Sequence, residues 1–301
     1  MNFITIRFWT SCLLAVAVSY PLAYVQAASL EKEYSGYIAQ TNPFDQLMRQ
    51  GYAQAGQRNY RGALQFFQQA MRARPNDRFA TAAIANMKSY IQRGDRGSIG
   101  FTAGRPGRVR SAATRGTCFQ NQKPPIPIVP SDREAQLTTS EYPTFYIYIP
   151  PITAKAQKME FVLRDDSNIT LYKKSFQPVQ AGIVTVRLPT IPLQVGKLYT
   201  WGFSMICDTR KRDEDIYIEG RVERTRDENL EAQLRNTSKI LDRAVLYTTA
   251  GIWENALTSV ATLRRQRPND REVQRYWQDL LQSIKAAELA NQPFLPCCTA
   301  K

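Results

Sequence analysis

The sequence predicts an α+β protein in which an antiparallel β-sandwich lies between two groups of helices. From Leu137 to Thr225, apolar and polar residues alternate and turn residues separate the runs, which is typical of short strands. Both flanks instead repeat apolar residues at helical spacing. A third observation, a motif that occurs once on each flank, indicates that the two groups of helices are related.

Six strands are expected in the central stretch, five of them with a clear inward face. The expected inward residues are Phe145, Ile147 and Ile149, then Met159, Phe161 and Leu163, then Val184, Val186 and Leu188, then Tyr199, Trp201, Phe203, Met205 and Cys207, and finally Ile216, Ile218 and Val222. The run from Ile169 to Phe176 alternates poorly and is expected at a sheet edge. Short strands separated by turns favour an immunoglobulin-like sandwich over residues 131–226. A barrel is the alternative that the pattern leaves open.

The first 27 residues read as a leader and not as part of either domain. Arg7 precedes an apolar run from Cys12 to Val25, and small residues before Ala28 fit a cleavage site. Tyr20-Pro21 interrupts the run, so it is short for a membrane span. We therefore expect residues 1–27 to be a cleaved signal peptide and the product to be periplasmic or secreted. An uncleaved anchor is the alternative.

Export changes the interpretation of the cysteines. Removing the leader leaves Cys118, Cys207, Cys297 and Cys298, an even number in an oxidising compartment. We expect a disulfide between Cys118 and Cys207, which would join the segment that enters the sandwich to its longest strand and stabilise it by about 4 kcal/mol. Two separate buried thiols are the alternative. Cys297 and Cys298 lie in a tail, residues 291–301, that is expected to be disordered.

Residues 42–93 are expected to form helices that resemble a tetratricopeptide unit. Small residues allow two antiparallel helices to approach, aromatic residues fill the groove between them, and Pro75 follows the second helix. The positions that carry this resemblance are Leu47, Gly51, Tyr60, Ala63, Phe67, Ala70 and Pro75. Asn76-Asp77 is expected to cap a third helix with an apolar stripe.

A repeat links this segment to the C-terminal helices, residues 227–290. The run Arg72-Ala-Arg-Pro-Asn-Asp-Arg78 recurs as Arg265-Gln-Arg-Pro-Asn-Asp-Arg271, 193 residues later. At the same displacement Leu47 corresponds to Ile240, Gly51 to Ala244, Tyr60 to Trp253, Ala63 to Ala256, Phe67 to Val260, Ala70 to Leu263, Met87 to Leu280 and Ile91 to Ile284. Such units need about three stacked copies to bury their faces. We therefore expect the flanks to pack on each other, on the sandwich, or on a second chain in a homodimer.

The segment between the first helices and the sandwich, residues 94–130, reads as a basic Gly/Arg/Pro linker. Its arginines include Arg105, Arg108 and Arg110, and the whole chain carries a net charge of +14, or +13 once Arg7 is removed with the leader. Export makes nucleic acid an improbable partner. An anionic glycan or cell-wall polymer is the better candidate ligand for this tract, and a linker without a ligand is the simpler reading.

Several runs from Arg105 onward resemble a known family. They are Arg105 to Cys118, Leu137 to Tyr146, Glu160 to Leu163, Gly196 to Trp201, Ser204 to Asp208 and Ile216 to Val222, followed by a helical tail with Arg267-Pro-Asn-Asp270. Together they are similar to a cyanobacterial family of exported proteins known as domain of unknown function 928. The resemblance covers roughly Gly104 to Ile284 and implies an exported protein with no catalytic residue to carry over. The N-terminal helices look like an addition to it.

The sequence offers little for catalysis. Histidine is absent, which excludes Ser-His-Asp and Cys-His chemistry. The main carboxylate groups, Asp165-Asp166 and Asp213-Glu-Asp215, lie at expected turns, where a weak calcium site is the most they suggest. We therefore expect a protein that is not an enzyme and that holds no cofactor and no metal.

The expected function is that of an exported interaction or scaffold protein of the cell envelope, which binds protein or peptide partners through its helices. The alternative is a glycan-binding module that uses the basic tract and outward-facing tyrosines. Tyr146 and Tyr148 lie opposite the inward face of their strand, and Tyr217 would join them if the strands were neighbours. These rings could stack on sugars, although packing of a flanking helix against them is the favoured reading.

Overall fold

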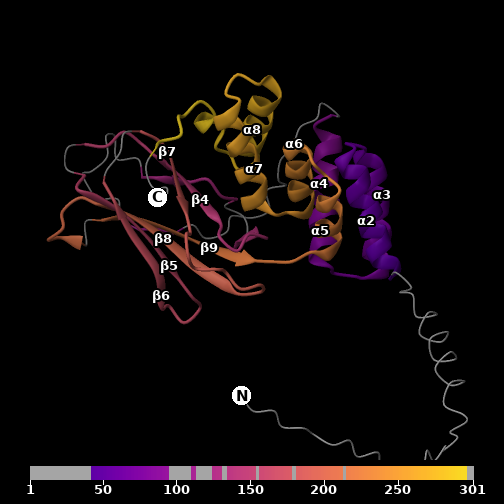
Figure 1. Cartoon of the computed structure of the whole chain (residues 1–301), viewed down its shortest axis with the longest axis horizontal. Coiled ribbons are helices and arrows are strands. Elements are labelled where there is room, and N and C mark those ends of the chain that lie inside the picture. The colour runs from indigo at the N-terminus through magenta and orange to yellow at the C-terminus, as the bar shows by residue number, and fades with distance from the viewer. Residues whose placement is uncertain are drawn as a thin grey trace, which may run out of the picture. The chain divides into compact units, whose positions relative to one another are not determined.

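The computed structural model describes residues 42–94, 110–112, 124–130, 134–153, 156–177, 181–212 and 215–296. Within these ranges the chain forms two β-sheets and a layer of helices (Figure 1). The α+β class expected from the sequence is confirmed. The expected signal peptide lies outside the described residues, and so does most of the basic tract.

The described N-terminal helices are α2 (Pro43–Gly56), α3 (Tyr60–Ala73) and α4 (Arg78–Gln92). Side-chain caps mark the starts of α3 and α4. Asn59 accepts a hydrogen bond from the backbone N–H of Gly62 at the start of α3, and Asp77 accepts from the first turn of α4. A cap of this kind stabilises a helix by about 1 kcal/mol.

The C-terminal helices repeat this arrangement. They are α5 (Glu228–Arg235), α6 (Ile240–Ala250), α7 (Trp253–Gln266), α8 (Arg271–Ser283) and a 3-10 turn η3 (Ala287–Leu289). Helix α7 starts and ends 193 residues after α3 (253 − 60 and 266 − 73), and α8 starts 193 residues after α4 (271 − 78). Asp270 caps α8 as Asp77 caps α4. The repeat inferred from the motif is therefore present in the helix boundaries.

The strands form two sheets. They are β1 (Arg110–Ala112), β2 (Ile126–Pro127), β3 (Gln136–Thr138), β4 (Thr144–Ile149), β5 (Lys158–Arg164), β6 (Thr170–Phe176), β7 (Gly182–Arg187), β8 (Leu198–Ile206) and β9 (Ile216–Arg224). One sheet has the order β1-β9-β8-β5-β6 with β3 also paired to β9, and the other has the order β2-β4-β7. Strand β6 lies at an edge, as expected from its poor alternation. One pairing departs from the expected antiparallel pattern, because β3 runs parallel to β9 before the chain crosses to the second sheet.

The two sheets enclose one apolar core. Every residue that the alternation assigned to an inward face is buried in this cluster. Phe145 from the small sheet approaches Phe161 at 4.9 Å between ring centroids, and Phe161 stacks on Trp201 at 6.4 Å. Period-two alternation predicts this core well because successive side chains of a strand point to opposite faces of the sheet.

A second core joins the helices to the outer face of the small sheet. Residues of α2, α3 and α4 share it with residues of α5 to α8 and with Tyr146 and Ile183. Helix α2 contacts α5 and α6, α4 contacts α6, and α7 contacts β3 and β4. Figure 1 shows the indigo N-terminal helices beside α5 and α6. The expectation that the two flanks pack on each other and on the sheets is confirmed.

The structure corrects two predicted boundaries. The range 94–130 includes strands β1 and β2, and Ile128 is fully buried, with its N–H donating to the carbonyl of Tyr146 at 2.9 Å. The tail expected to be disordered from residue 291 instead pairs with β7 as far as Leu295. The N–H of Ile183 donates to Pro293 O at 2.8 Å, and Leu295 N–H donates to Ile183 O at 2.9 Å. Pairings of two or three residues leave no periodic signal in a sequence.

Candidate functional site

Glu254 is a buried carboxylate at the contact between α7 and the sheets. Its side chain accepts hydrogen bonds from Thr138 Oγ1 at 2.7 Å, Thr144 N at 2.9 Å and Thr258 Oγ1 at 2.9 Å. Burial raises the pKa of Glu254, although these donors act in the opposite direction. The donors come from β3, β4 and α7, so this carboxylate ties the helix to both sheets.

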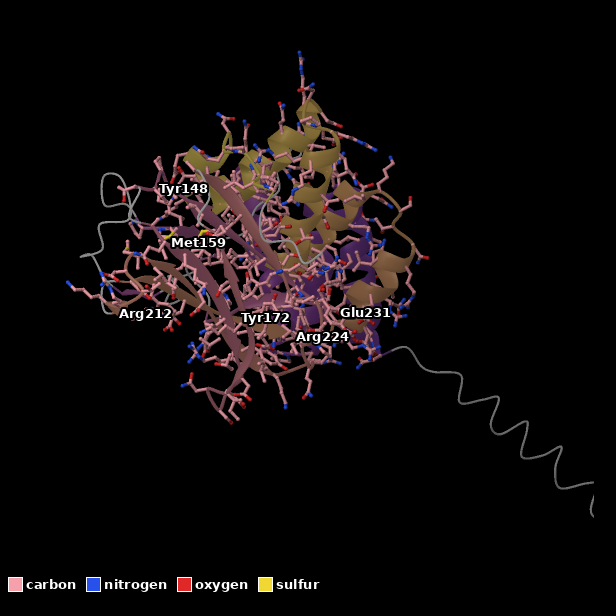
Figure 2. The ribbon with its side chains drawn as sticks, turned by 60° about the vertical axis from the view of Figure 1, so that its left-hand side comes forward. Tyr148, Met159, Tyr172, Arg212, Arg224 and Glu231 are labelled. Carbon is pink, nitrogen blue, oxygen red and sulfur yellow. The ribbon has the colours of Figure 1, made fainter. Side chains whose placement is uncertain are left out.

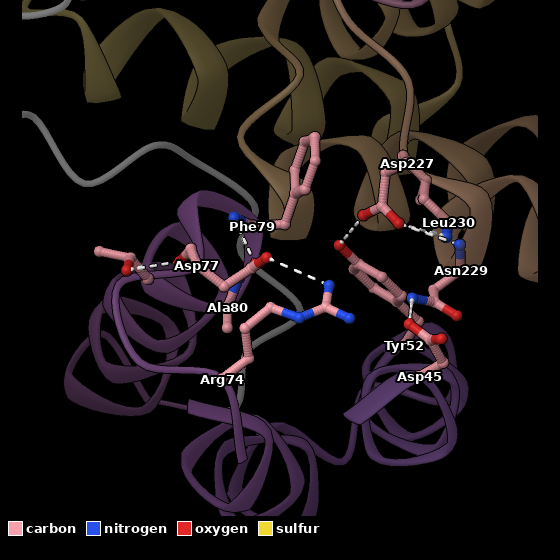
Figure 3. A network of polar contacts seen from close by, with 10 residues as sticks. Asp45, Tyr52, Arg74, Asp77, Phe79, Ala80, Asp227, Asn229 and Leu230 are labelled. Atoms are coloured by element: carbon pink, nitrogen blue, oxygen red, sulfur yellow. Dashed lines mark hydrogen bonds and ion pairs between the residues drawn. The ribbon is translucent and has the colours of Figure 1, made fainter. Parts of the chain in front are cut away.

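Asp227 is a second buried carboxylate, and it joins the N-terminal helices α2 to α4 to the C-terminal helices α5 to α8 (Figure 3). We call these two groups of helices the N-terminal arm and the C-terminal arm. Its Oδ2 accepts from Tyr52 Oη of α2 at 2.6 Å, and its Oδ1 accepts from the N–H groups of Asn229 and Leu230 at the start of α5. Burial raises the pKa of Asp227, and burial together with the Asp227 charge raises the pKa of Tyr52 well above its ordinary value. A side chain of α2, Tyr52, therefore completes the hydrogen bonds of the residue that caps α5.

Asn229 extends this network toward the surface. Its Nδ2 donates to Asp45 Oδ1 at 3.0 Å, and its Oδ1 accepts from Arg49 Nε at 3.0 Å. Both partners belong to α2, so three side chains of α2 reach the start of α5. These contacts hold α2 in a fixed register against the C-terminal arm.

A pocket of about 630 Å³ opens where the two arms meet. We call it the junction pocket. It is lined by Gly56, Gln57, Arg58, Ser238, Lys239, Ile240, Leu241, Asp242, Leu263, Arg267 and Glu272. Arg58 lies 3.1 Å from Glu272 and 3.6 Å from Asp242, so acidic and basic side chains both face the space. The lining comes from both arms, because Gly56 ends α2 and residues 57–58 follow it, whereas the other lining residues belong to the segment from 238 to 272.

A second pocket, of about 330 Å³, lies on the C-terminal arm. We call it the arginine pocket. It is lined by Arg264, Arg265, Pro268, Gln274, Trp277, Gln278, Ala290, Asn291 and Phe294. None of these lining residues is acidic.

The tyrosines expected on an outer face are covered. Tyr146 is only 3% exposed, its Oη donates to Thr258 Oγ1 at 3.2 Å, and its ring meets Phe294 at 6.5 Å between centroids. Tyr148, labelled in Figure 2, is half-buried against the helical core. The packing interpretation is therefore the one that the structure supports, and Tyr146 presents no free ring to a sugar.

Tyr217 does not join these tyrosines, because β9 and β4 belong to different sheets. It is half-buried over Gly202 of β8, and its Oη donates to Glu219 at 3.1 Å. Arg105 and Arg108 lie outside the described residues, and Arg110 is described only as the first residue of β1. The structure thus does not bring the predicted ligand surface together.

Cys207 follows β8 at the rim of the sandwich core and is buried. It is disulfide-bonded, and no other cysteine falls within the described residues. The other cysteines of the expected mature chain lie outside the described residues; they are Cys118, Cys297 and Cys298. The pairing of Cys207 with Cys118 therefore stays a prediction.

The turn carboxylates take part in local contacts. Asp165 accepts from the N–H of Ile169 at 2.8 Å, and Asp215 pairs with Arg212 at 2.6 Å (Arg212 is labelled in Figure 2). In the described ranges, no three His, Cys, Asp or Glu side chains gather closely enough to hold a metal ion. Across the same ranges no helix is both long and apolar enough to cross a bilayer.

The sequence identifies the family of this chain. A family model described as Domain of Unknown Function (DUF928) matches residues 110–294, which is more than half of the chain. The chain belongs to the DUF928 family. The DUF928 match takes in the described strands β1 to β9 and helices α5 to α8, whereas α2 to α4 precede it. The N-terminal helices nevertheless share a core with the DUF928 domain.

The other comparisons add little to the DUF928 assignment. No curated protein matches the chain. Among solved structures, the apo structure of Bacteroides uniformis beta-glucuronidase 3 is similar at 8% identity with a TM-score of 0.23, covering 49% of this chain and 26% of that one. The chain thus spans about a quarter of that protein's chain, and a likeness at this score carries no argument about the DUF928 protein.

Sequence reasoning missed the residues that are most informative in the structure. Asp227 and Glu254 lie at the starts of helices, where an acidic residue is ordinary, so nothing marked them as buried. Arg264 and Arg265 carried a weak signal. Arg265 begins the second copy of the repeated motif and Arg264 precedes it, and the first copy has Met71-Arg72 at the same positions.

Proposed function

We propose that this protein is an exported, non-enzymatic interaction protein of the cell envelope that binds protein or peptide segments through its helical layer. The observation that carries the proposal is the junction pocket, which both arms build together. Its size lies within the range of about 300–1,000 Å³ that is usual for binding pockets. A site assembled from two distant segments exists only in the folded layer.

The repeat supports a tetratricopeptide-like interpretation of this layer. Helices α3 and α7 have the same length and the same displacement as the motif, and their equivalent residues Tyr60 and Trp253 are both buried. Stacked helix pairs of this kind commonly present concave surfaces to peptides. The paired sheets are proposed to be an immunoglobulin-like sandwich that serves as the platform for α7.

Export is the second part of the proposal. The leader, the even number of cysteines after it, and the disulfide at Cys207 all suit an oxidising compartment. We propose that Cys118 is the partner of Cys207 and that the protein is periplasmic or secreted in a cyanobacterium, as the family resemblance implies. Expression with the leader, followed by N-terminal sequencing, should give a product that begins at Ala28. Non-reducing peptide mapping should recover one cross-linked pair that contains residues 118 and 207.

Peptide binding can be tested directly. A random peptide library would be panned on the purified protein that begins at Ala28, and selected peptides would be titrated against the wild type and Lys239→Glu. Lys239 is exposed at the rim of the junction pocket, so reversing its charge should change the affinity of peptides that dock there. Lys197→Glu, an exposed lysine before β8, is the matched control. If no peptide is enriched, or if both variants bind alike, the proposed site is wrong.

The glycan-binding alternative and a homodimer stay predictions. Tyr146 is buried, so the alternative would depend on the basic tract and on the half-buried rings of Tyr148 and Tyr217. Retention of the protein on envelope polysaccharide at high salt, lost in Tyr148→Ala, would favour that alternative over the helical site.

A further inference from the structure

The arginine pocket holds two positive charges that no acidic side chain of the described residues balances. Within the described residues, neither Arg264 nor Arg265 forms an ion pair with a carboxylate. The junction pocket differs in this respect, because Asp242 and Glu272 face Arg58 there. Burial and the neighbouring charge of Arg265 both lower the pKa of Arg264, as expected where cations lie together without an anion.

Backbone contacts hold Arg264 in place. Its Nη2 donates to the carbonyl of Ala290 at 2.9 Å, and both Nη atoms donate to the carbonyl of Gln292 at 3.2 Å. The guanidinium lies over the Trp277 ring with its Cζ 5.0 Å from the centroid. An arginine held in this way loses little side-chain freedom when it binds a ligand, which favours affinity.

Arg265 lies beside it and is exposed. Its Cζ is 4.1 Å from the centroid of Phe294, whose ring also lies 5.4 Å from Trp277. The two guanidinium groups thus share one aromatic wall, and the exposed amides of Gln274 and Gln278 line the same pocket. Guanidinium and amide N–H groups are suitable donors to the two oxygens of a carboxylate.

The repeat shows that the helices can fold without the arginine, glutamine and tryptophan side chains that line this pocket. At a displacement of 193 residues, Arg264 corresponds to Met71, Gln274 to Thr81, Trp277 to Ile84 and Gln278 to Ala85. Met71 and Ile84 pack against the helical core in the first copy. The same helix pair therefore folds with apolar or small residues at these positions. Arg265 corresponds to Arg72, so the second copy differs in carrying two adjacent arginines in place of one.

We propose that the arginine pocket binds a carboxylate side chain of an acidic peptide segment, with Arg265 and Arg264 as its donors. This inference rests on the proposed function, since it names the chemistry of the peptide and the part of the helical layer that receives it. A volume of about 330 Å³ accommodates a single acidic side chain with part of its backbone.

The test uses a fluorescein-labelled hexaglutamate peptide and, as a neutral control, hexaglutamine, titrated by fluorescence anisotropy into the protein that begins at Ala28. Hexaglutamate should bind and hexaglutamine should not. Arg265→Ala should weaken hexaglutamate binding at least tenfold, because hydrogen bonds to charged groups are the stronger ones. Arg72→Ala is the matched control: Arg72 is the exposed equivalent of Arg265 in the first copy and does not line the pocket.

Circular dichroism of each variant would show that it is folded. Arg265→Ala is preferred to Arg264→Ala because Arg264 also holds the segment from residue 290 to residue 292.

Equal weakening by Arg265→Ala and Arg72→Ala would show non-specific charge attraction and overturn the inference. An absence of hexaglutamate binding would also overturn the inference. Arg264 and Arg265 would then serve only to hold the C-terminal segment through its carbonyl groups and Phe294. Arg265-dependent binding of trigalacturonate without peptide binding would overturn the choice of a peptide. In each of these cases, peptides selected on the junction pocket would leave the proposed function standing.

Discussion

Tyr52 Oη donates a hydrogen bond to Asp227 Oδ2 at 2.6 Å, across 175 positions of sequence. Tyr52 belongs to α2 and is fully buried, and Asp227 is the residue that caps α5. The contact connects the helices that precede the DUF928 domain to the first helix that follows its sheets. The repeat predicted that these two groups of helices are related. Tyr52 and Asp227, which hold them together, are not among the residues that repeat.

Replacing Tyr52 with Phe should destabilise the protein by about 1 to 3 kcal/mol, because Asp227 loses one of its donors in a buried site. The free energy of unfolding would be measured by urea denaturation at neutral pH. Tyr148→Phe removes a hydroxyl from a half-buried tyrosine and should change the free energy of unfolding little. Equal effects in the two variants would contradict a structural role for the Tyr52–Asp227 bond.

Glu254 should make the stability depend on pH. Burial raises its pKa in the folded protein above that in the unfolded chain. The folded state therefore keeps a proton that the unfolded chain releases, so this contribution is fully present below the unfolded pKa and is lost as the pH rises through the folded one. The free energy of unfolding of the wild type, minus that of Glu254→Gln, should fall as the pH rises above the ordinary glutamate pKa of about 4.3. A difference that increases over this range would contradict the assignment.

Tyr146 should also make the free energy of unfolding fall as the pH rises, but at high pH. Burial raises its pKa from 10.0 to about 12. Between these values the unfolded chain loses the phenolic proton and the folded state keeps it, so stability falls as the pH rises. Each pH unit in this interval is worth up to about 1.4 kcal/mol. From about pH 10 to about pH 11.5 the wild type should therefore lose about 1.5 kcal/mol more than Tyr146→Phe, because the slope is below its maximum near each pKa. Parallel stability curves would show that Tyr146 is not buried.

Gly51 should tolerate alanine only when Phe67 is also changed. A Cβ atom at Gly51 would lie 2.5 to 2.8 Å from three ring carbons of Phe67. Overpacking of this kind costs about 1 to 3 kcal/mol. The second copy of the repeat has Ala244 and Val260 at these positions.

We therefore expect Gly51→Ala to be destabilising in the wild type and nearly neutral in Phe67→Val, a coupling of at least about 1 kcal/mol in a double-mutant cycle. Gly56→Ala is the control, because a Cβ there meets only a Leu246 methyl carbon at 3.6 Å. Additive effects of Gly51→Ala and Phe67→Val would rule out the proposed steric contact.

Much of the fold could be predicted from local patterns. The inward face of each long strand followed from alternation, and the caps at Asp77 and Asp270 followed from the motif. The candidate site could not be predicted in this way. Arg264 is held by the carbonyl groups of residue 290, the last residue of the expected C-terminal helices, and of residue 292, in the tail that was expected to be disordered. No local pattern shows which distant backbone a side chain will reach.

The sequence by itself determined the class of the fold, the family, and the relation between the two helical arms. These features depend on periodicity and on repeated residues, which are properties of short segments. Only the tertiary structure decided that Tyr146 is covered by a helix, that Asp227 and Glu254 are buried between elements, and that Arg264 and Arg265 share a pocket without an acid. Burial and charge balance depend on the packing of segments that are far apart in the chain, and that packing is established only when the arms and the sheets come together.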